Sequence, residues 1–229
     1  MANEKDTIRA FITDVLKQCK NFKRVKFFAI LDNASTDGTV GIVKEIEHQT
    51  KELRLVWAPE NRCVVDAYIR GYREALRSGC NWILEIDAGF SHQPSEIPQF
   101  FETMQQGYDC VFGSRFCKGG KFTGRNLKRY LISRGGTYLA NMIIGTNLRD
   151  MTSGFELFSR PALQMVLDKG IRSRGHFFQT EIKAFCHKLN IIEVPITYSN
   201  PSVSVNGSVL FDSFSNLGRL FIMRLKGQL

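Results

Sequence analysis

Short apolar runs alternate with amphipathic segments along the first half of the chain, and this alternation limits the possible folds more than any other feature. The apolar runs are bounded by turn residues and are predicted to be strands, at residues 25–31, 53–58, 81–86 and 108–113. Helical spacing of apolar residues lies between them, at residues 39–49, 64–77 and 95–105. Alternating strands and helices of this kind are typical of an α/β domain with a mostly parallel sheet.

The second half of the chain is less regular. It predicts helices at residues 126–144, 161–168 and 177–188, followed by a strand at 191–198. No repeat, low-complexity tract or linker interrupts the 229 residues, a length that fits one domain. We therefore expect a single domain over residues 1–229.

The last segment, residues 207–229, is predicted to form an amphipathic helix. Its apolar residues recur at helical spacing, and Arg219, Arg224 and Lys226 lie near its end. A basic amphipathic helix can lie on an anionic membrane surface, and it can equally pack on the core as the final helix of the domain. The pattern does not choose between these two positions.

The net charge of +9 points to an anionic partner. Nucleic acid, an acidic membrane surface and a phosphorylated ligand all fit, and so does a basic surface that only contacts water. No basic-aromatic recognition motif is present, so nucleic acid is not an expected partner.

Cysteine usage and the amino-terminal residues bear on location. The six cysteines form no CxxC spacing, so neither a zinc site nor a disulfide framework is indicated. The first residues, "MANEKDTIRA", are charged, and no apolar run approaches the roughly 20 residues that span a bilayer. We expect a cytoplasmic protein, in solution or peripheral on the cytoplasmic face of a membrane.

Two aspartates follow predicted strands directly. Asp32 comes after the run at 25–31, and Asp87 comes after the run at 81–86. Ligands of open α/β sheets bind at the carboxyl ends of strands, where a carboxylate leaves the apolar core yet is held rigidly by it. Either aspartate alone could simply cap the next turn, because Asp is common there. Two of them in one sheet favour a binding site.

Five motifs occur in an order that resembles one known family. They are "LDNASTDGT" (31–39), "IDAGFSHQPSEIP" (86–98), "FGSRF" (112–116), "RYLISRGG" (129–136) and "DMTSGFELFSR" (150–160). The chain resembles the family two glycosyltransferases, in particular the dolichol-phosphate (polyprenyl-phosphate) mannosyltransferases. The resemblance implies a GT-A, Rossmann-like fold and inverting transfer of a hexose, mannose or glucose. It also implies a nucleotide-sugar donor (GDP-mannose or UDP-glucose), Mg²⁺ or Mn²⁺, and a polyprenyl or dolichyl phosphate acceptor.

On the donor side, the resemblance assigns nucleotide binding to Asp32, Asn33, Arg62 and Asp87. Asn33 stands where many members have a second Asp, and its amide oxygen is an uncharged acceptor. Asp87 is also the expected metal ligand and a catalytic residue, since hard cations prefer oxygen ligands. Gly89 replaces the second carboxylate of the family's D-x-D motif.

On the acceptor side, the resemblance assigns phosphate binding to Arg115, Arg129 and Ser133. Residues 129 and 133 share one helix face, so both can contact one phosphate, which a guanidinium binds bidentately. A solvated basic helix is the alternative reading of this segment. Arg115 is also expected to take part in catalysis. Gln179 and Glu181 match a stretch near the family's active site and are expected to form its wall.

Three departures from the family pattern motivate a second hypothesis. The family's first strand would precede Asn3-Glu4 and is expected to be missing, the second D-x-D carboxylate is absent, and Cys63 and Val65 stand where glycines are usual. His92 is expected to be a loop residue rather than a metal ligand. The alternative is therefore a catalytically impaired relative that acts as a lipid- or partner-binding subunit.

Overall fold

The chain folds into alternating helices and strands. The structure, a computed structural model, describes residues 1–123, 127–199 and 207–229. In chain order the elements are α1 (Ile8–Gln18), β1 (Phe27–Leu31), α2 (Thr39–Gln49), β2 (Leu53–Trp57), α3 (Val64–Arg77), β3 (Trp82–Glu85), the 3₁₀ helix η1 (Pro94–Glu96), α4 (Ile97–Met104), β4 (Cys110–Ser114), β5 (Lys121–Phe122), α5 (Leu127–Ile144), β6 (Glu156–Ser159), α6 (Arg160–Lys169), α7 (Phe178–Cys186), β7 (Ile191–Pro195), β8 (Thr197–Tyr198) and α8 (Gly207–Leu225).

Parallel pairing predominates among these strands, as the sequence predicts. β1 pairs with β2, β4 with β7, and β5 with β8, all in parallel. The larger sheet has the order β3-β6-β4-β7, and β6 is antiparallel to both of its neighbours. The register of β3 and β6 places Glu85 opposite Glu156, so two carboxyl groups lie side by side inside the protein.

Three elements were not predicted from the sequence: the helix α1, the two-residue strand β5 and the strand β6. The strand β6 is a short run that contains a buried glutamate, and an acidic residue inside "FELF" obscures the apolar pattern of a strand. The helix α1 buries Ile8, Phe11, Ile12 and Val15, whose spacing is helical and could have been recognised.

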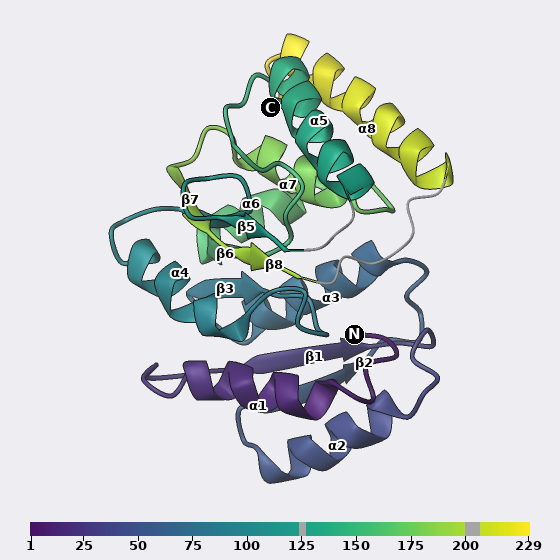
Figure 1. The fold of residues 1–229 in the computed structure, drawn as a ribbon, viewed down its shortest axis with the longest axis vertical. Coiled ribbons are helices and arrows are strands. Elements are labelled where there is room, and N and C mark those ends of the chain that lie inside the picture. The colour runs from purple at the N-terminus through teal and green to yellow at the C-terminus, as the bar shows by residue number, and fades with distance from the viewer. Residues whose placement is uncertain (124–126, 200–206) are drawn as a thin grey trace.

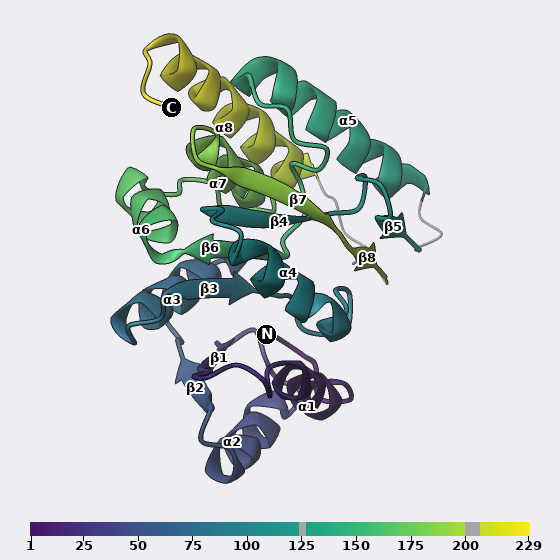
Figure 2. The same ribbon diagram turned by 90° about the vertical axis from the view of Figure 1, so that its left-hand side faces the viewer.

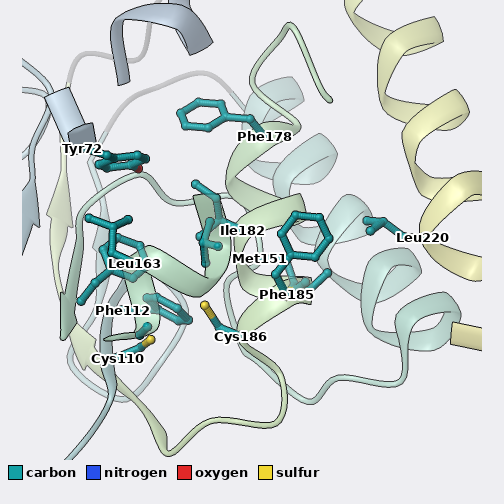
Figure 3. Packing of buried hydrophobic residues seen from close by; sticks show 14 of the residues in the cluster. Tyr72, Cys110, Phe112, Met151, Leu163, Phe178, Ile182, Phe185, Cys186 and Leu220 are labelled. Carbon is teal, nitrogen blue, oxygen red and sulfur yellow. The ribbon is translucent and has the colours of Figure 1, made fainter. Parts of the chain in front are cut away.

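The larger sheet has a core on each face. Along β4 the side chains of Cys110 and Phe112 enter one core and that of Val111 enters the other, as the two-residue period of a strand requires. All residues of β4 are buried, which is usual for a strand covered on both faces. Figure 3 shows the first of these cores, where Phe112 and Leu163 pack against Ile182 of α7.

The sheet is divided between β1 and β3. Figures 1 and 2 show β1 and β2 with α1 and α2 on one side of this division, and β3 with the larger sheet on the other. Among the described residues, β1 pairs only with β2, and β3 pairs only with β6.

Helices α5 and α8 lie side by side at one end of the molecule (Figures 1 and 2). Leu217 and Leu220 of α8 are buried, whereas Phe211, Phe214 and Leu225 are exposed. Both arginines of this segment donate to neighbouring helices: Arg219 to Glu181 of α7, and the exposed Arg224 to the carbonyl oxygens of Met142 and Ile143 at the end of α5. No described helix is both long enough and apolar enough to span a bilayer.

Candidate functional site

The turn after β3 carries Asp87 at the edge of the sheet. Its Oδ1 accepts a hydrogen bond from the hydroxyl of Tyr68 on α3, and its side chain is 39% exposed. Burial, together with the negative charge of Asp87, raises the pKa of Tyr68 well above its ordinary value. The phenol therefore stays protonated, and its hydrogen bond to Oδ1 holds the carboxylate in one orientation.

The turn after β1 carries Asp32. Its Oδ1 accepts from the Ala34 backbone N–H at 3.0 Å, and its Oδ2 accepts from Asn61 Nδ2 at 3.1 Å. The neighbouring Asn33 is exposed and donates from Nδ2 to the Pro59 carbonyl oxygen at 3.1 Å. The two adjacent residues thus lie in different surroundings.

Arg62 precedes α3, where the carboxylate of Asp66 caps the helix. Asp66 Oδ2 accepts from the backbone N–H groups of Arg62 at 2.8 Å and Cys63 at 3.3 Å. This cap satisfies N–H groups at the start of the helix and fixes the loop between β2 and α3. Cys63 and Val65 replace the glycines of the resembling family. Cys63 caps the start of α3, and the side chain of Val65 enters the core.

Arg115 follows β4 and forms a buried ion pair with Asp150. Nε donates to Asp150 Oδ2 and Nη2 to Asp150 Oδ1, both at 2.7 Å, and Nη2 also donates to the Thr152 hydroxyl. Burial alone would raise the pKa of Asp150, but the Arg115 guanidinium outweighs it and holds that pKa below its ordinary value. The pair therefore stays ionised near neutral pH and fixes the plane of the guanidinium.

Arg129 and Ser133 lie one turn apart on α5. Ser133 is buried and Arg129 is half-buried. Burial lowers the pKa of His176, and the positive charge of Arg129 lowers it further, so the arginine lies close to the loop before α7. The spacing predicted from the sequence thus turns both side chains toward the same side of the helix.

One cavity of about 1580 Å³ brings these elements together. Its wall includes Asp32, Arg62, Asp87, Arg115, Arg129 and Ser133. Asn33 is not among the lining residues. Of the two expected wall residues near the start of α7, Gln179 lines the cavity, whereas Glu181 is buried and accepts hydrogen bonds from Ser173 and Arg219.

The cavity has both polar and apolar walls. Its apolar lining comes from two places. Between the two parts of the sheet it includes Phe28 and Ile30 of β1 and Leu84 of β3, and beside the arginines it includes Ile132 of α5 and Phe214 of α8. A ligand that combines a charged group with a long apolar part would match both kinds of wall.

A buried polar network lies behind Asp87, and sequence reasoning missed it. Glu85 accepts from the Tyr72 hydroxyl and from Gln179 Nε2, while Glu156 accepts from Lys183 Nζ. Burial raises the pKa of Glu156 to about 7, although Lys183 opposes this, and burial with the nearby Glu156 raises the pKa of Glu85. The available signal was a charged residue inside each of several apolar segments, "WILEI", "FELF" and "TEIKAF".

His92 lies in the loop between β3 and η1, as expected, but it is buried. Only 1% of it is exposed, and its ring packs against Phe155 and Tyr198. Burial lowers the pKa of His92 to about 4, so the imidazole is neutral at pH 7. Its Nδ1 is buried without a hydrogen-bond partner among the residues that the structure describes, and lies 3.9 Å from Asp87 Oδ2.

These residues fit a divalent cation that a ligand helps to hold. Within the described parts of the chain, no three His, Cys, Asp or Glu side chains form a preformed metal cage. Mg²⁺ and Mn²⁺ do not need one, because they accept carboxylate, water and phosphate oxygens. Asp87 offers a carboxylate, and the orphaned Nδ1 of His92 indicates that a polar group is expected beside it.

Comparisons with known proteins agree on the glycosyltransferases. The model of the family described as Glycosyl transferase family 2 matches residues 1–167. The undecaprenyl-phosphate mannosyltransferase of Micrococcus luteus is 29% identical over 195 residues, which cover 83% of this chain and 80% of that protein. The polyprenol monophosphomannose synthase of Mycolicibacterium smegmatis is 24% identical over 207 residues, which cover 89% of this chain and 77% of that protein.

A solved structure shares the fold. The glucosyl-3-phosphoglycerate synthase of Mycobacterium tuberculosis, crystallised with Mn²⁺, UDP-glucose and phosphoglyceric acid, superposes with a TM-score of 0.66. The match covers 95% of this chain and 77% of that one, at 17% sequence identity. At this identity the likeness concerns the arrangement of helices and strands rather than the substrates.

Proposed function

The chain belongs to glycosyl transferase family 2 and has the GT-A fold, and from this premise we propose that it transfers a hexose from a nucleoside-diphosphate sugar to a polyprenyl phosphate. The observation that carries the proposal is the single cavity that joins the carboxylates of two strand ends to the arginine and serine of α5. The two curated relatives support the lipid acceptor through their names, which specify undecaprenyl phosphate and polyprenol monophosphomannose.

On the donor side we assign the nucleotide to Asp32, Arg62 and Asp87. Asp32 holds carboxylate oxygens rigidly at the cavity wall, where ribose hydroxyls and base N–H groups can donate to them. Asn33 stays a predicted contact to the base, although in this structure it bonds to Pro59. The donor sugar is mannose or glucose, with GDP-mannose and UDP-glucose as the candidate donors.

We assign the divalent cation, Mg²⁺ or Mn²⁺, to Asp87. When bound there, it would supply positive charge that stabilises the departing nucleoside diphosphate. The chain's own contribution is to orient the Asp87 carboxylate through Tyr68.

On the acceptor side we assign the lipid phosphate to Arg115, Arg129 and Ser133. Guanidinium groups bind phosphate through charge-assisted hydrogen bonds, and the serine hydroxyl can add another. Asp150 holds the Arg115 guanidinium in one plane, so binding the phosphate would require little reorganisation.

The chemistry needs no general base from the protein. A phosphate monoester is anionic near neutral pH, so one of its oxygens can attack the anomeric carbon of the sugar directly. The new bond joins that oxygen to the anomeric carbon, while the bond from the same carbon to the diphosphate oxygen breaks and the electron pair leaves with the nucleoside diphosphate. This single displacement inverts the anomeric configuration.

The lipid chain would leave the site along α5 and α8. Ile132 and Phe214 line the cavity beside Arg129 and Ser133, and further apolar side chains on both helices are exposed: Leu127, Leu131, Tyr138, Met142, Phe211, Phe221, Ile222 and Leu225. Such a surface favours peripheral contact with a membrane. The guanidinium groups of Arg219 and Arg224 already donate hydrogen bonds to α7 and α5, so the apolar side chains are the main contribution that we assign to this contact.

The test is transfer of a labelled sugar into lipid. The protein is incubated with polyprenyl phosphate, Mn²⁺ or Mg²⁺, and radiolabelled GDP-mannose or UDP-glucose, and the product is extracted into organic solvent. We expect a labelled, mild-acid-labile lipid whose formation requires the cation. Failure to label the lipid from any common GDP- or UDP-sugar would reject the proposal.

The alternative is a catalytically impaired relative that binds lipid or a partner. The division between β1 and β3 and the glycine at position 89 favour it. It predicts that nucleotides with a divalent cation leave the melting temperature unchanged. A cation-dependent rise in melting temperature that Asp87→Ala abolishes would count against it.

A further inference from the structure

The space beside Gly89 is filled by another carboxylate. A Cβ atom at position 89 would lie 2.7 Å from Glu4 Oε1 and 2.8 Å from Glu4 Oε2. We propose that Glu4 holds the divalent cation together with Asp87, and so supplies the acidic oxygens that residue 89 lacks. The inference rests on the proposed function, and it adds a residue from the amino-terminal segment to the same site.

Hydrogen bonds to two other segments hold Glu4 in place. Its backbone N–H donates to the Thr39 hydroxyl at 2.9 Å, and the next N–H, of Lys5, donates to Asp37 Oδ2 at 2.9 Å. On the helix side, the Thr7 hydroxyl donates to Glu4 Oε2 at 2.6 Å. The segment before α1 is thus tied to the loop before α2, and the carboxylate has a defined position rather than that of a freely rotating surface side chain.

The turn that carries Gly89 leaves room for this carboxylate. Gly89 has a φ of +80°, a backbone conformation that favours glycine. An aspartate here would have to adopt this conformation and would also bring its side chain against Glu4. Glycine at this position and the glutamate at position 4 are therefore sterically matched.

His92 gives an independent indication that a ligand belongs here. It is almost completely buried and lines the same cavity, and within the described chain its Nδ1 has no hydrogen-bond partner. This atom lies 3.9 Å from Asp87 Oδ2, too far for a direct hydrogen bond. A cation or one of its water ligands near Asp87 would give both atoms a partner.

Two carboxylates suit a cation that arrives with a nucleotide. Glu4, Asp87 and Asp32 all act electrostatically on the Met1 amino group, so the three carboxylates lie around the same part of the cavity. Their mutual repulsion is relieved when a divalent cation binds. No third protein ligand completes a cage among the described residues, so diphosphate and water oxygens would supply the remaining coordination.

The experiment measures Mn²⁺ binding directly, by the loss of the free Mn²⁺ EPR signal on titration with protein in the presence of GDP or UDP. These nucleotides carry no sugar, so turnover does not enter. Glu4→Gln keeps the shape of the side chain and its bond to Thr7 but removes the charge, and we expect it to weaken Mn²⁺ binding by about tenfold or more. Asp87→Asn should weaken it at least as much, and the exposed Asp6→Asn, two residues along the same segment, should leave it unchanged.

A second pair of variants tests the geometry. Glu4→Ala should weaken Mn²⁺ binding, and Glu4→Ala combined with Gly89→Asp should recover part of it, because the new carboxylate enters the space that Glu4 vacates. A double variant that binds Mn²⁺ no better than Glu4→Ala would overturn the inference. Far-ultraviolet circular dichroism and the melting temperature without metal confirm that each variant is folded.

The outcomes separate this inference from the proposed function. If Glu4→Gln binds Mn²⁺ as the unmodified protein does while Asp87→Asn does not, Glu4 is not a ligand and the transferase proposal stands. If Glu4→Gln weakens nucleotide binding equally with and without Mn²⁺, Glu4 contacts the nucleotide instead, and the inference is also overturned. If the unmodified protein binds no Mn²⁺ with either nucleotide, both proposals fail.

Discussion

Arg115 donates three hydrogen bonds from its side chain inside the protein, two to Asp150 and one to Thr152. A motif could identify this arginine as a phosphate ligand but could not reveal its carboxylate partner, 35 residues further along the chain. The ion pair restricts the motion of the Arg115 side chain. Because of this restriction, the guanidinium is already oriented where it lines the cavity.

We predict that Asp150→Asn destabilises the fold by about 3–5 kcal/mol, because it leaves a buried guanidinium without its counter-charge. The free energy of unfolding is measured by urea denaturation at pH 7. Asp168→Asn, an exposed aspartate on α6, is the matched control and should change it by less than about 0.5 kcal/mol. Equal effects of the two substitutions would mean that the buried pair contributes no special stability.

Arg129 and Arg134 lie on the same helix but in different surroundings. Arg129 lines the cavity, whereas Arg134 is exposed and lies over the ring of Phe116. We predict that Arg129→Gln lowers kcat/KM for the lipid phosphate roughly 100-fold, since a phosphate-binding charge is lost. Arg134→Gln should retain nearly full activity. Steady-state transfer at several lipid concentrations checks this, and equal losses would assign α5 only a general electrostatic role.

Lys183 and Glu156 make stability depend on pH. The folded-state pKa of Glu156 lies above its ordinary value, so the folded protein binds a proton more readily than the unfolded chain. The contribution of Glu156 to the free energy of unfolding is therefore fully present below pH 4.5, and it is lost as the pH rises toward about 7. The positive charge of Lys183 opposes the rise in the pKa of Glu156. Lys183→Met removes this charge, so the pKa of Glu156 should rise further and the free energy of unfolding should fall over a wider range of pH.

We expect Lys183→Met to cost on the order of 3 kcal/mol at pH 8 and clearly less at pH 5, where Glu156 can be protonated. Urea denaturation at the two pH values measures the difference. Lys44→Met, an exposed lysine of α2, serves as the control and should show the same small effect at both. A pH-independent loss for Lys183→Met would show that packing, rather than charge, accounts for its role.

At the scale of elements, the periodicity of the sequence located helices and strands well. The bounds of α2 and α3 agree with the predicted segments, and β1, β2, β3 and β4 lie within or overlap the predicted runs. Helix periodicity is a local property that survives in any fold which buries one face. The strand β6 escaped prediction because its glutamate is neutralised by a lysine from α7, a partner that only the folded chain provides.

The surface of α5 and α8 leads to a prediction about membranes. Phe211 and Phe214 are 78% and 62% exposed. We predict that replacing both with serine lowers partitioning onto vesicles by at least about tenfold, since each loses apolar area that a membrane would bury. Co-sedimentation with vesicles of phosphatidylcholine and phosphatidylglycerol measures this.

Trp57→Ser is the control for that measurement. Trp57 is also exposed, at 44%, but it ends β2, in the part of the molecule away from α5 and α8 (Figure 1). We expect it to leave partitioning unchanged. If the serine variants of α8 also partition like the unmodified protein, this helix does not mediate membrane contact.

At the scale of the whole molecule, the cavity joins two parts of the protein. Asp32 belongs to the part with β1 and β2, while Asp87, Arg115 and Arg129 belong to the part with the larger sheet. The two parts are not joined by strand pairing among the described residues. A nucleotide that contacts both Asp32 and Asp87 would therefore connect them.

We predict that GDP or UDP with Mn²⁺ stabilises the protein by about 2.7 kcal/mol when the free ligand is at 100 times its Kd. Differential scanning calorimetry should show a rise in melting temperature that EDTA reverses and that Asp32→Asn reduces. Lys44→Met again serves as a neutral control. An unchanged melting temperature with both nucleotides would favour the catalytically impaired alternative.

The sequence by itself determined the local features of this protein. Apolar periodicity specified most helices and strands, the acidic turns followed from strand ends, and the i, i+4 spacing placed Arg129 and Ser133 on one helix face, because each depends only on residues close in the chain. Tertiary structure alone decided that Glu4 lies against Gly89, that Asp150 holds Arg115, and that His92 is buried beside Asp87. Glu4 and Gly89, like Arg115 and Asp150, are distant in the chain, and only the packing of the whole domain brings them into contact. His92 is close to Asp87 in the chain, but its burial depends on Phe155 and Tyr198, which are distant from it in the sequence.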